Sequence, residues 1–543
     1  MGRRSKVLAL GVVVALIAGG AVYSAATTGG VSQTPQSYAQ RLLKQPGTRF
    51  MTAAARTGLG MIATGNFRFG SVLSIGGDEN AAPTQPVATT ASLQVQSTAA
   101  AMPTNVLVND PSADSRELDQ TTQSETTIAA HGSNLVTGYN DSQQALIALT
   151  AGADLTGYSY STNGGASWTD GGTLPNDPGN VNLGDPWLAS TSNGDFFYST
   201  LMLSPNGISV GVARSSNNGH TWGTPVQILP DLGSAGFELA DKPALTSGPN
   251  PDGGTVLYDA WDDSACDNTS CFNGLPVAHS TDGGRTWKVV YADKVSQDSS
   301  GCSFTQYIGS QPLVLADGTL DVAAEKISTV DPNCNGAPLE FSEVMFTSTD
   351  GGHTFSNAQK IASVTPAFAD GALTLGPGEL MRTIEFPTIA ERGGVLYVAW
   401  NDGRRSNHSH IALASSANGG HSWDLSFVTQ GMGDEVQPAL TADASGLHLL
   451  YYGRTGHTLD VYEANSTNGL SWNRQRISSQ SSPGVPTFPQ FDPIIAFGYM
   501  GDYIANVQEG THHYFAWGDN RHIVKDLLWP GGRHDPDVFF AKN

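Results

Sequence analysis

Three arginine residues follow apolar runs at equivalent places in a repeated segment of this 543-residue chain. They are Arg404 (or its neighbour Arg405), Arg454 and Arg521, and the whole chain contains only 18 arginines. A guanidinium group forms two parallel hydrogen bonds with a carboxylate, which suits it to bind an acidic ligand. The series therefore predicts a carboxylate-binding site. The alternative is that the arginines brace carboxylates of neighbouring repeats.

An eight-residue pattern recurs between these segments: Ser, any, Asp/Asn, any, Gly, any, Ser/Thr, Trp/Phe. Its terminal aromatic residues are 54, 65, 68, 68 and 49 residues apart, which indicates a repeat architecture. Asp or Asn bonds its own backbone in a tight turn, Gly adopts positive φ, and the aromatic ring packs inward. The pattern thus predicts hairpin turns without chemistry of their own. The copies are STNGGASW (161–168), SSNNGHTW (215–222), STDGGRTW (280–287), STDGGHTF (348–355), SANGGHSW (416–423) and NSTNGLSW (465–472), which has Thr467 where Asp is expected.

A second repeat, a pair of short strands, occurs seven times between TTIAA at 126–130 and HYFAWGDNR at 513–521. Each module has about 60 residues, enough for four strands and their loops. We therefore predict an all-β, seven-bladed β-propeller over residues 105–543, with six blades as the alternative. The last module lacks an outer strand, and we expect Val106–Val108 to supply it by pairing with Val538–Phe540, which would remove an exposed sheet edge.

The octapeptides resemble the Asp-box, or BNR, repeats of sialidases, sortilin-type receptors and xyloglucanase-type glycoside hydrolases. The resemblance covers residues 105–543, and bacterial sialidase-like proteins match it best. It implies a β-propeller with Asp-box hairpins on one face. The residues that enter each first strand and leave each second strand then meet at the axial opening on the other face. The residues predicted at this opening are Glu125, Asp141, Asp185, Glu238, Asp241, Asp262, Glu325, Glu385, Glu435, Asp502, Tyr503 and the three arginines.

The resemblance to sialidases also implies roles for residues of this opening. The substrate-binding residues would be Arg404, Arg454 and Arg521. Asp262 is predicted to bind substrate as well, because of its place at the same opening. The catalytic residues would be Tyr503 as nucleophile, Glu385 as its base and Asp141 as the acid. A neutral tyrosine suits an anionic substrate because a carboxylate nucleophile would be repelled.

Two functions remain open from the sequence. One is an exported sialidase-like propeller that hydrolyses glycosidic bonds of acidic sugars at the axial opening. The other is a non-catalytic propeller that binds glycan or protein at the cell envelope. The chain lacks the Phe/Tyr-Arg-Ile-Pro motif of sialidases, which favours the second function, whereas the arginine series favours the first. Whether the protein is an enzyme stays open.

The first 26 residues have the features of a targeting segment. Basic residues precede an apolar run from Val7 to Tyr23, and small residues follow it. This predicts either a cleaved signal peptide or an uncleaved N-terminal anchor, which would be the only membrane contact. Residues 27–104 read as a linker, first basic, with a helical stretch around Tyr38–Lys44, then rich in Ala, Thr and Pro. We expect a secreted or cell-envelope protein, most simply a monomer.

The four cysteines fit this exported location. We expect structural disulfides that join Cys266 to Cys271 and Cys302 to Cys334, on the basis of proximity. The spacings do not indicate a zinc site, and we predict no metal centre and no cofactor, although carboxylate-rich loops leave Ca²⁺ open. The formal net charge is −22, and no basic stripe exists that would neutralise phosphates. The partner expected is a glycan or glycoconjugate, and nucleic acid is excluded.

Overall fold

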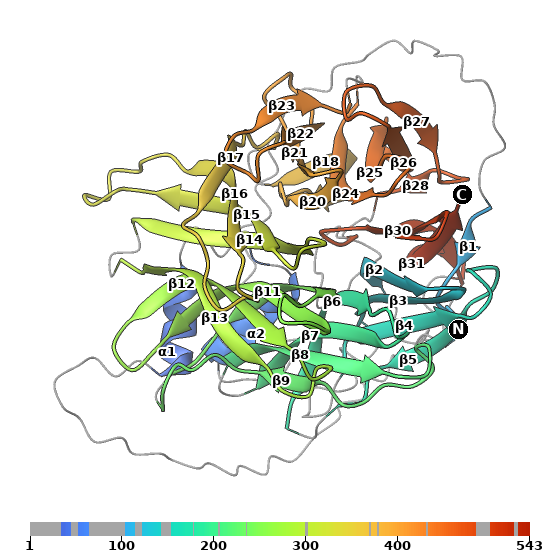
Figure 1. Cartoon of the computed structure of the whole chain (residues 1–543). Helices are drawn as coiled ribbons and strands as arrows, with labels where there is room; N and C mark the ends of the chain where they lie inside the picture. Colours follow the sequence, from blue (N-terminus) through green and yellow to red (C-terminus); the bar gives the residue numbers. More distant parts are fainter. Residues whose placement is uncertain are drawn as a thin grey trace, which may run out of the picture. The chain divides into compact units, whose positions relative to one another are not determined.

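Seven antiparallel sheets of four or five strands form a β-propeller in the computed structural model of the chain (Figure 1). The predicted all-β class and the seven blades are therefore confirmed. The structure describes residues 34–44, 51, 53–64, 104–113, 122–142, 154–176, 179–204, 207–234, 236–298, 302–368, 371–376, 379–429, 433–484, 500–525 and 530–543. The predicted targeting segment lies outside these residues.

The first four blades follow the chain, and each runs from the innermost strand to the outermost. Blade 1 contains β2 (Gln123–His131), β3 (Asn134–Asp141), β4 (Thr156–Ser161) and β5 (Thr169–Thr173). Blade 2 contains β6 (Val181–Ser190), β7 (Phe196–Ser204), β8 (Gly207–Ser215) and β9 (Val226–Ile228). Blade 3 contains β10 (Ala240–Pro249), β11 (Thr255–Cys266), β12 (Cys271–Ser280) and β13 (Lys288–Ser296). Blade 4 contains β14 (Phe304–Val314), β15 (Leu320–Thr329), β16 (Glu340–Ser348) and β17 (Gln359–Ser363).

The remaining blades complete the ring, with a small hairpin before blade 5. This hairpin pairs β18 (Ala372–Gly376) with β19 (Glu379–Arg382). Blade 5 contains β20 (Thr388–Arg392), β21 (Val395–Asp402), β22 (His410–Ser416) and β23 (Asp424–Phe427). Blade 6 contains β24 (Glu435–Ala442), β25 (Leu447–Thr455), β26 (Thr458–Ser466), β27 (Asn473–Arg476) and β28 (Ser482–Pro483). Blade 7 contains β29 (Ala505–Glu509), β30 (His512–Val524), β31 (Arg533–Lys542) and β1 (Val106–Leu107).

Blade 7 is closed by the N-terminal strand, as the sequence predicts. In the register of β1 and β31, Val106 pairs with Phe540 and Leu107 with Phe539. The Val108 amide also donates a 2.9 Å hydrogen bond to the Val538 carbonyl. The outermost strand of the last blade thus comes from the other end of the propeller, which ties the two ends together.

Apolar clusters fill the interfaces between neighbouring blades. One cluster joins blades 7 and 1 through Tyr514 and Phe540 on one side and Ile128 and Tyr139 on the other. Equivalent clusters join blades 1 to 2, 3 to 4, 4 to 5, 5 to 6 and 6 to 7. Because the strands are covered on both faces, few charged residues are needed, in keeping with the 14% charged residues of the chain.

The six octapeptides form the turns between the third and fourth strands of blades 1 to 6. In the turn of blade 1, the Ser161 hydroxyl donates to Asn163, and the amides of Gly165 and Ser167 donate back to these two side chains. A Cβ atom on Gly165 would lie 2.1 Å from the Phe540 ring of blade 7, so only glycine fits there. In the sixth copy Asn468, rather than Thr467, takes the role of the aspartate, and it accepts from the Ser466 hydroxyl.

Two helices occur within the segment predicted as a linker: α1 (Pro35–Leu42) and α2 (Ala53–Thr64). Tyr38 and Leu59 are buried in one apolar cluster with residues of blades 2 and 3, including Leu183 and Phe237. The helical stretch expected around Tyr38 is therefore present, and it packs on the propeller. The limits of the predicted domains stay a prediction. Among the described residues, no helix is long and apolar enough to cross a membrane.

Both predicted disulfides are present. Cys266 is bonded to Cys271, with a Cα–Cα distance of 4.0 Å, and Cys302 is bonded to Cys334, with a Cα–Cα distance of 5.3 Å. The first bond links the facing ends of β11 and β12. Disulfides persist in oxidising compartments, so the two bonds are consistent with the expected export.

Candidate functional site

The innermost strands of five blades are interrupted by a β-bulge at the same level. Each bulge holds one residue in the left-handed backbone region, with φ between 50° and 64°. These residues are Glu125, Asp185, Lys242, Gly309 and Gln437. Such a backbone is strained for a residue other than glycine, and strained residues concentrate at functional sites. Bulges also redirect side chains, so this ring is the first place to look for a site.

A cavity of about 80 Å³ lies among the innermost strands of blades 2 to 7. Lys242, Gly309 and Gln437 of the bulges line it, together with the aromatic residues Trp187, Phe386 and Tyr503 and the carboxyl of Asp502. Because six blades contribute to its wall, the cavity lies on the propeller axis. We call it the axial cavity.

Lys242 is the one described residue that brings a basic side chain to the axial cavity. It is 3% exposed, and its ammonium nitrogen lies 3.7 Å from the ring centroid of Tyr503, 4.9 Å from that of Trp187 and 5.0 Å from that of Phe386. These are cation–π contacts. Within the described residues, the Lys242 ammonium has no hydrogen bond and no ion pair, so its three donors are available inside the cavity.

Carboxyl groups around the axial cavity are strongly affected by burial. Burial lowers the pKa of Lys242, while the negative charges of Glu125, Asp185, Asp502 and Asp262 oppose that change. Burial raises the pKa of Asp502 to about 7, although the nearby Arg382 guanidinium, 3.2 Å away, opposes the shift. At neutral pH the Asp502 carboxyl group is therefore protonated in about half of the molecules. In that form its carboxyl group is a hydrogen-bond donor beside the Lys242 donor.

The three arginines of the predicted clamp are each bound to a carboxylate of their own. Arg404 contacts Asp402 through Nε at 2.8 Å and through Nη2 at 2.6 Å. Arg521 contacts Asp519, two residues before it, through Nη2 alone, and its backbone amide donates to the same carboxylate at 2.9 Å. Trp400 and Trp517, two residues earlier again, donate their indole N–H groups to the same two aspartates.

Arg454 uses a different carboxylate but is held in a similar way. Its Nη1 lies 3.2 Å from Oδ2 of Asp434, and its Nε donates to the Gly456 carbonyl at 2.8 Å. None of the three arginines lines the axial cavity. All three carboxylates belong to the arginine's own blade, so each arginine braces its own repeat and not a neighbouring one, as the alternative had expected. The clamp stays a prediction.

Asp262 links two blades from its position in β11, opposite Asp241 of β10. The Gly309 amide of the next blade donates a hydrogen bond to the Asp262 carboxyl group. Asn140 of blade 1 makes the same link to the amide of Asp185, at 2.7 Å. A polar residue at this repeat position thus holds the bulge of the following blade. No contact of Asp262 among the described residues supports its predicted role in substrate binding. Its negative charge does raise the pKa of Lys242, against the effect of burial.

The predicted catalytic residues do not gather into one group. Tyr503 lines the axial cavity, but its hydroxyl donates to the Pro186 carbonyl at 2.8 Å, and burial raises its pKa well above the ordinary value. The carboxylates that act most strongly on Tyr503 are Glu125 and Asp185, not its predicted base Glu385. Asp141 is buried at the end of β3, where it accepts a weak 3.4 Å hydrogen bond from Gln123.

Glu385 belongs instead to a buried group of acids between blades 4 and 5. Glu325 and Glu343 face each other across β15 and β16, and both are fully buried. Burial raises the pKa of Glu325 to about 8 and that of Glu343 well above its ordinary value. Burial, and then the charge of Glu325, also raise the pKa of Glu385. Glu325 is therefore largely protonated at neutral pH.

A larger hollow, about 470 Å³, lies at the outer strand β13 of blade 3. It is lined by Asp231, Tyr291 and Lys294, but the Lys294 ammonium already stacks on the rings of Phe272 and Tyr291. The axial cavity is the stronger candidate because its cation, Lys242, is buried, whereas Lys294 is exposed to solvent.

Sequence reasoning missed Lys242. Of the segment DKPALTS at 241–247, only Asp241 is among the residues predicted at the axial opening, and the lysine next to it is not. The signal that marks Lys242 is positional: it occupies the same place in its module as Glu125, Asp185 and Gln437. A single lysine at a repeat position that otherwise holds acidic or amide residues is the sequence signal that could have indicated a functional residue.

Solved structures similar to this chain include sialidases and other propeller proteins that act on sugars. The Hadza microbial sialidase Hz136 is 15% identical, with 71% of this chain and 73% of that chain covered and a TM-score of 0.38. An ulvan lyase of polysaccharide lyase family PL25 is 12% identical, with 65% of this chain and 80% of that chain covered and a TM-score of 0.43. The Trypanosoma rangeli sialidase in complex with sialic acid is 12% identical, with 80% of this chain and 56% of that chain covered and a TM-score of 0.36. No family model and no curated protein matches the chain.

Proposed function

We propose that this propeller binds the carboxylate of an acidic sugar in the axial cavity, and that Lys242 contacts that carboxylate. The observation that carries the proposal is the Lys242 ammonium, which is buried, surrounded by aromatic rings and without a hydrogen bond or ion pair to another described residue. Burying a charge without a partner is costly, so such a group is usually retained for a ligand.

The surroundings of Lys242 fit a carboxylate. A protonated Asp502 supplies a second donor to the same space, and both donors suit an acceptor that carries negative charge. Trp187 and Phe386 offer apolar surfaces to the carbon atoms of a sugar. The cavity of about 80 Å³ has room for a carboxylate and the ring atoms next to it, since one water takes about 30 Å³. The terminal acidic group of a glycan is therefore the part that would enter.

Binding without hydrolysis is the function that the geometry supports best. A tyrosine nucleophile needs a base close to its hydroxyl, whereas the Tyr503 hydroxyl donates to a backbone carbonyl. Hydrolysis remains the second candidate because of Asp502, whose pKa of about 7 is that of a general acid at neutral pH. In either case the protein would act outside the cytoplasm, at the cell envelope or as a secreted protein.

Calorimetric titration with 3′-sialyllactose, a glucuronic acid-terminated disaccharide and lactose tests the proposal. At about pH 6, below the Asp502 pKa of about 7, we expect the two acidic sugars to bind and lactose not to bind. Lys242→Met should weaken acidic-sugar binding at least about tenfold, the loss of one charge-assisted contact. The matched control is Lys288→Met, on the exposed start of β13 in the same blade. Equal binding of lactose, or unchanged binding by Lys242→Met, would refute the proposal. Release of free sugar by the wild type, lost in Asp502→Asn, would favour hydrolysis.

A further inference from the structure

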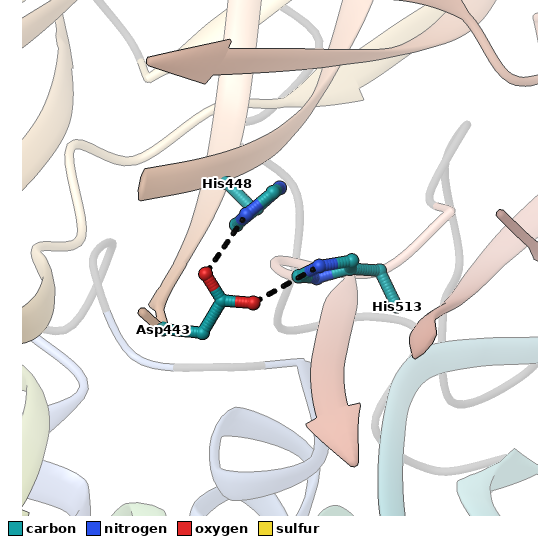
Figure 2. A group of neighbouring side chains, drawn as sticks. All are labelled: Asp443, His448 and His513. Carbon is teal, nitrogen blue, oxygen red and sulfur yellow. Dashed lines mark ion pairs between the residues drawn. The ribbon is translucent and has the colours of Figure 1, made fainter. Parts of the chain in front are cut away.

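A second polar cluster lies far along the chain from Lys242, where the inner strands of blades 6 and 7 turn. It consists of Asp443 in the turn between β24 and β25, His448 in β25 and His513 in β30 (Figure 2). The side chain of each residue is 10% exposed, so the cluster is largely shielded from water but still reachable. One donor atom from each residue lies within 4.8 Å of the others.

The distances in this cluster are long for hydrogen bonds between charged groups. Asp443 Oδ1 lies 3.5 Å from Nε2 of His448, and Asp443 Oδ2 lies 3.4 Å from Nε2 of His513. Charge-assisted hydrogen bonds are about 2.7–2.9 Å long. Two ligand atoms of a tetrahedral zinc ion lie about 3.3 Å apart, given metal–ligand bonds of about 2.0–2.1 Å. The spacing therefore matches a pair of metal ligands better than an ion pair.

Glu463 fixes the orientation of the His448 ring. Nδ1 of His448 lies 3.0 Å from Oε1 of the buried Glu463 carboxylate, which is best satisfied when Nδ1 carries the proton. The Nε2 lone pair of a neutral His448 then faces the Asp443 carboxylate, which repels it. The Ser445 hydroxyl lies 3.2 Å from Nε2 of His448, but it donates its proton to Asp443 at 2.6 Å and so does not supply a donor for that lone pair. A carboxylate behind a ligating histidine is the usual second partner in zinc sites.

Asp443 is suited to be an anionic ligand. Its Oδ1 accepts from the Ser445 amide, the Ser445 hydroxyl and the Gly446 amide. Three donors on one oxygen stabilise the carboxylate form of Asp443. Oδ2 takes no part in this turn and faces His513 (Figure 2). The two imidazole rings stack with centroids 3.7 Å apart, which disfavours a positive charge on both.

We propose that the Asp443 carboxylate, His448 Nε2 and His513 Nε2 bind one divalent transition-metal ion of the Zn²⁺ type. Nitrogen and carboxylate ligands in this number suit zinc, with a water in the fourth position. The two Nε2 atoms converge on one ion after a rotation of one imidazole out of the stack. The ion joins blade 6 to blade 7 next to the C-terminal residue Asn543, whose side chain donates to Glu463 at 2.6 Å. Its role is to hold blade 6 against blade 7.

Zinc binding by the full chain tests this proposal. After treatment with a chelator and its removal, we expect one Zn²⁺ per chain by calorimetric titration. A hundredfold excess of free Zn²⁺ over its Kd should raise Tm by about 3 °C. His513→Gln and Asp443→Asn should abolish both effects. The matched control His512→Gln, which removes the exposed neighbouring histidine, should leave both unchanged.

Substitution with Co²⁺ gives a readout that does not depend on stability. Visible absorption bands of tetrahedral Co²⁺ should appear in the wild type and in His512→Gln, and should be missing in His513→Gln. Retained bands in His513→Gln, or bands lost in His512→Gln, would overturn the ligand assignment. The absence of zinc binding by the folded wild type would overturn the site itself, and a protonated His448 between Asp443 and Glu463 would then account for the cluster.

Discussion

Two kinds of cation in this propeller have opposite surroundings. Arg404 and Arg521 each lie beside a buried aspartate that also accepts a hydrogen bond from a tryptophan N–H. The positive charge of each arginine is therefore compensated by an aspartate in direct contact. Lys242 lies deeper, with carboxyl groups nearby but none in hydrogen-bond contact among the described residues. The comparison teaches that a repeated cation is a structural feature of the blade, whereas a cation found once is a candidate for function.

The largest effect should come from Arg521→Met. The side chains of Arg521 and Asp519 are 7% and 1% exposed, so the substitution leaves an uncompensated charge in the interior. Breaking a buried pair in this way costs about 3–5 kcal/mol. Thermal unfolding followed by circular dichroism should show Tm lower by about 3–5 °C for a propeller of this size.

The control for this prediction is Arg285→Met, in the variable position of an exposed octapeptide turn, which should leave Tm unchanged. Acidic-sugar binding by Arg521→Met, measured below its Tm, should equal that of the wild type. A loss of binding with an unchanged Tm would mean that Arg521 contacts the ligand, and the contrast with Lys242 would fail.

The buried acids between blades 4 and 5 give the next effect. Glu325 has a folded-state pKa of about 8, above its ordinary value of 4.5, because it is buried opposite Glu343. The folded protein therefore holds a proton that the unfolded chain has released. The stabilising contribution is complete below about pH 4.5 and is lost as the pH rises through about 8. One such proton gives a slope of at most about 1.4 kcal/mol per pH unit.

Urea unfolding at several pH values measures this slope. We expect the wild type to lose stability between about pH 5 and pH 8, and Glu325→Gln to show a smaller loss because its amide does not titrate. Asp317→Asn, at an exposed turn of the same blade, is the control. A wild type whose stability rises over this range would show that the buried acids are ionised in the folded state.

Lys242→Met gives the converse of Arg521→Met. The methionine side chain keeps the contacts with Tyr503 and Trp187 but loses the charge. We expect at least about tenfold weaker binding of acidic sugars, about 1.4 kcal/mol, with a smaller fall in Tm than in Arg521→Met. A variant that unfolds yet still binds when kept cold would identify Lys242 as a brace, and would remove the main distinction between the two kinds of cation.

The sequence predicts the fold well because repeats report on local geometry. The octapeptides, the seven strand pairs and the two disulfides all depend on residues close in the chain or on a regular spacing, and each is present in the structure. The pairing of Val106 with Phe540 was also predictable, since a blade one strand short needs a partner. The site was harder to predict, because which side chains line the axis depends on a bulge in each first strand. Nothing in the alternation of apolar and polar residues reveals that Lys242 has a left-handed backbone.

The smallest change in Tm should come from Arg454→Met, which tests whether Arg454 braces the fold or binds the ligand as part of the predicted clamp. The Arg454 side chain is 29% exposed, and its partner Asp434 keeps hydrogen bonds from the His408 ring and the Ser409 amide when the arginine is removed. A partly exposed pair of this kind contributes about 1 kcal/mol or less, which corresponds to a Tm change of about 1 °C. Acidic-sugar binding should be unchanged, because Arg454 does not line the axial cavity. If Arg454→Met instead abolishes binding at an unchanged Tm, the arginine series contacts the ligand after all, and the acidic sugar binds at the ends of the second strands rather than at Lys242.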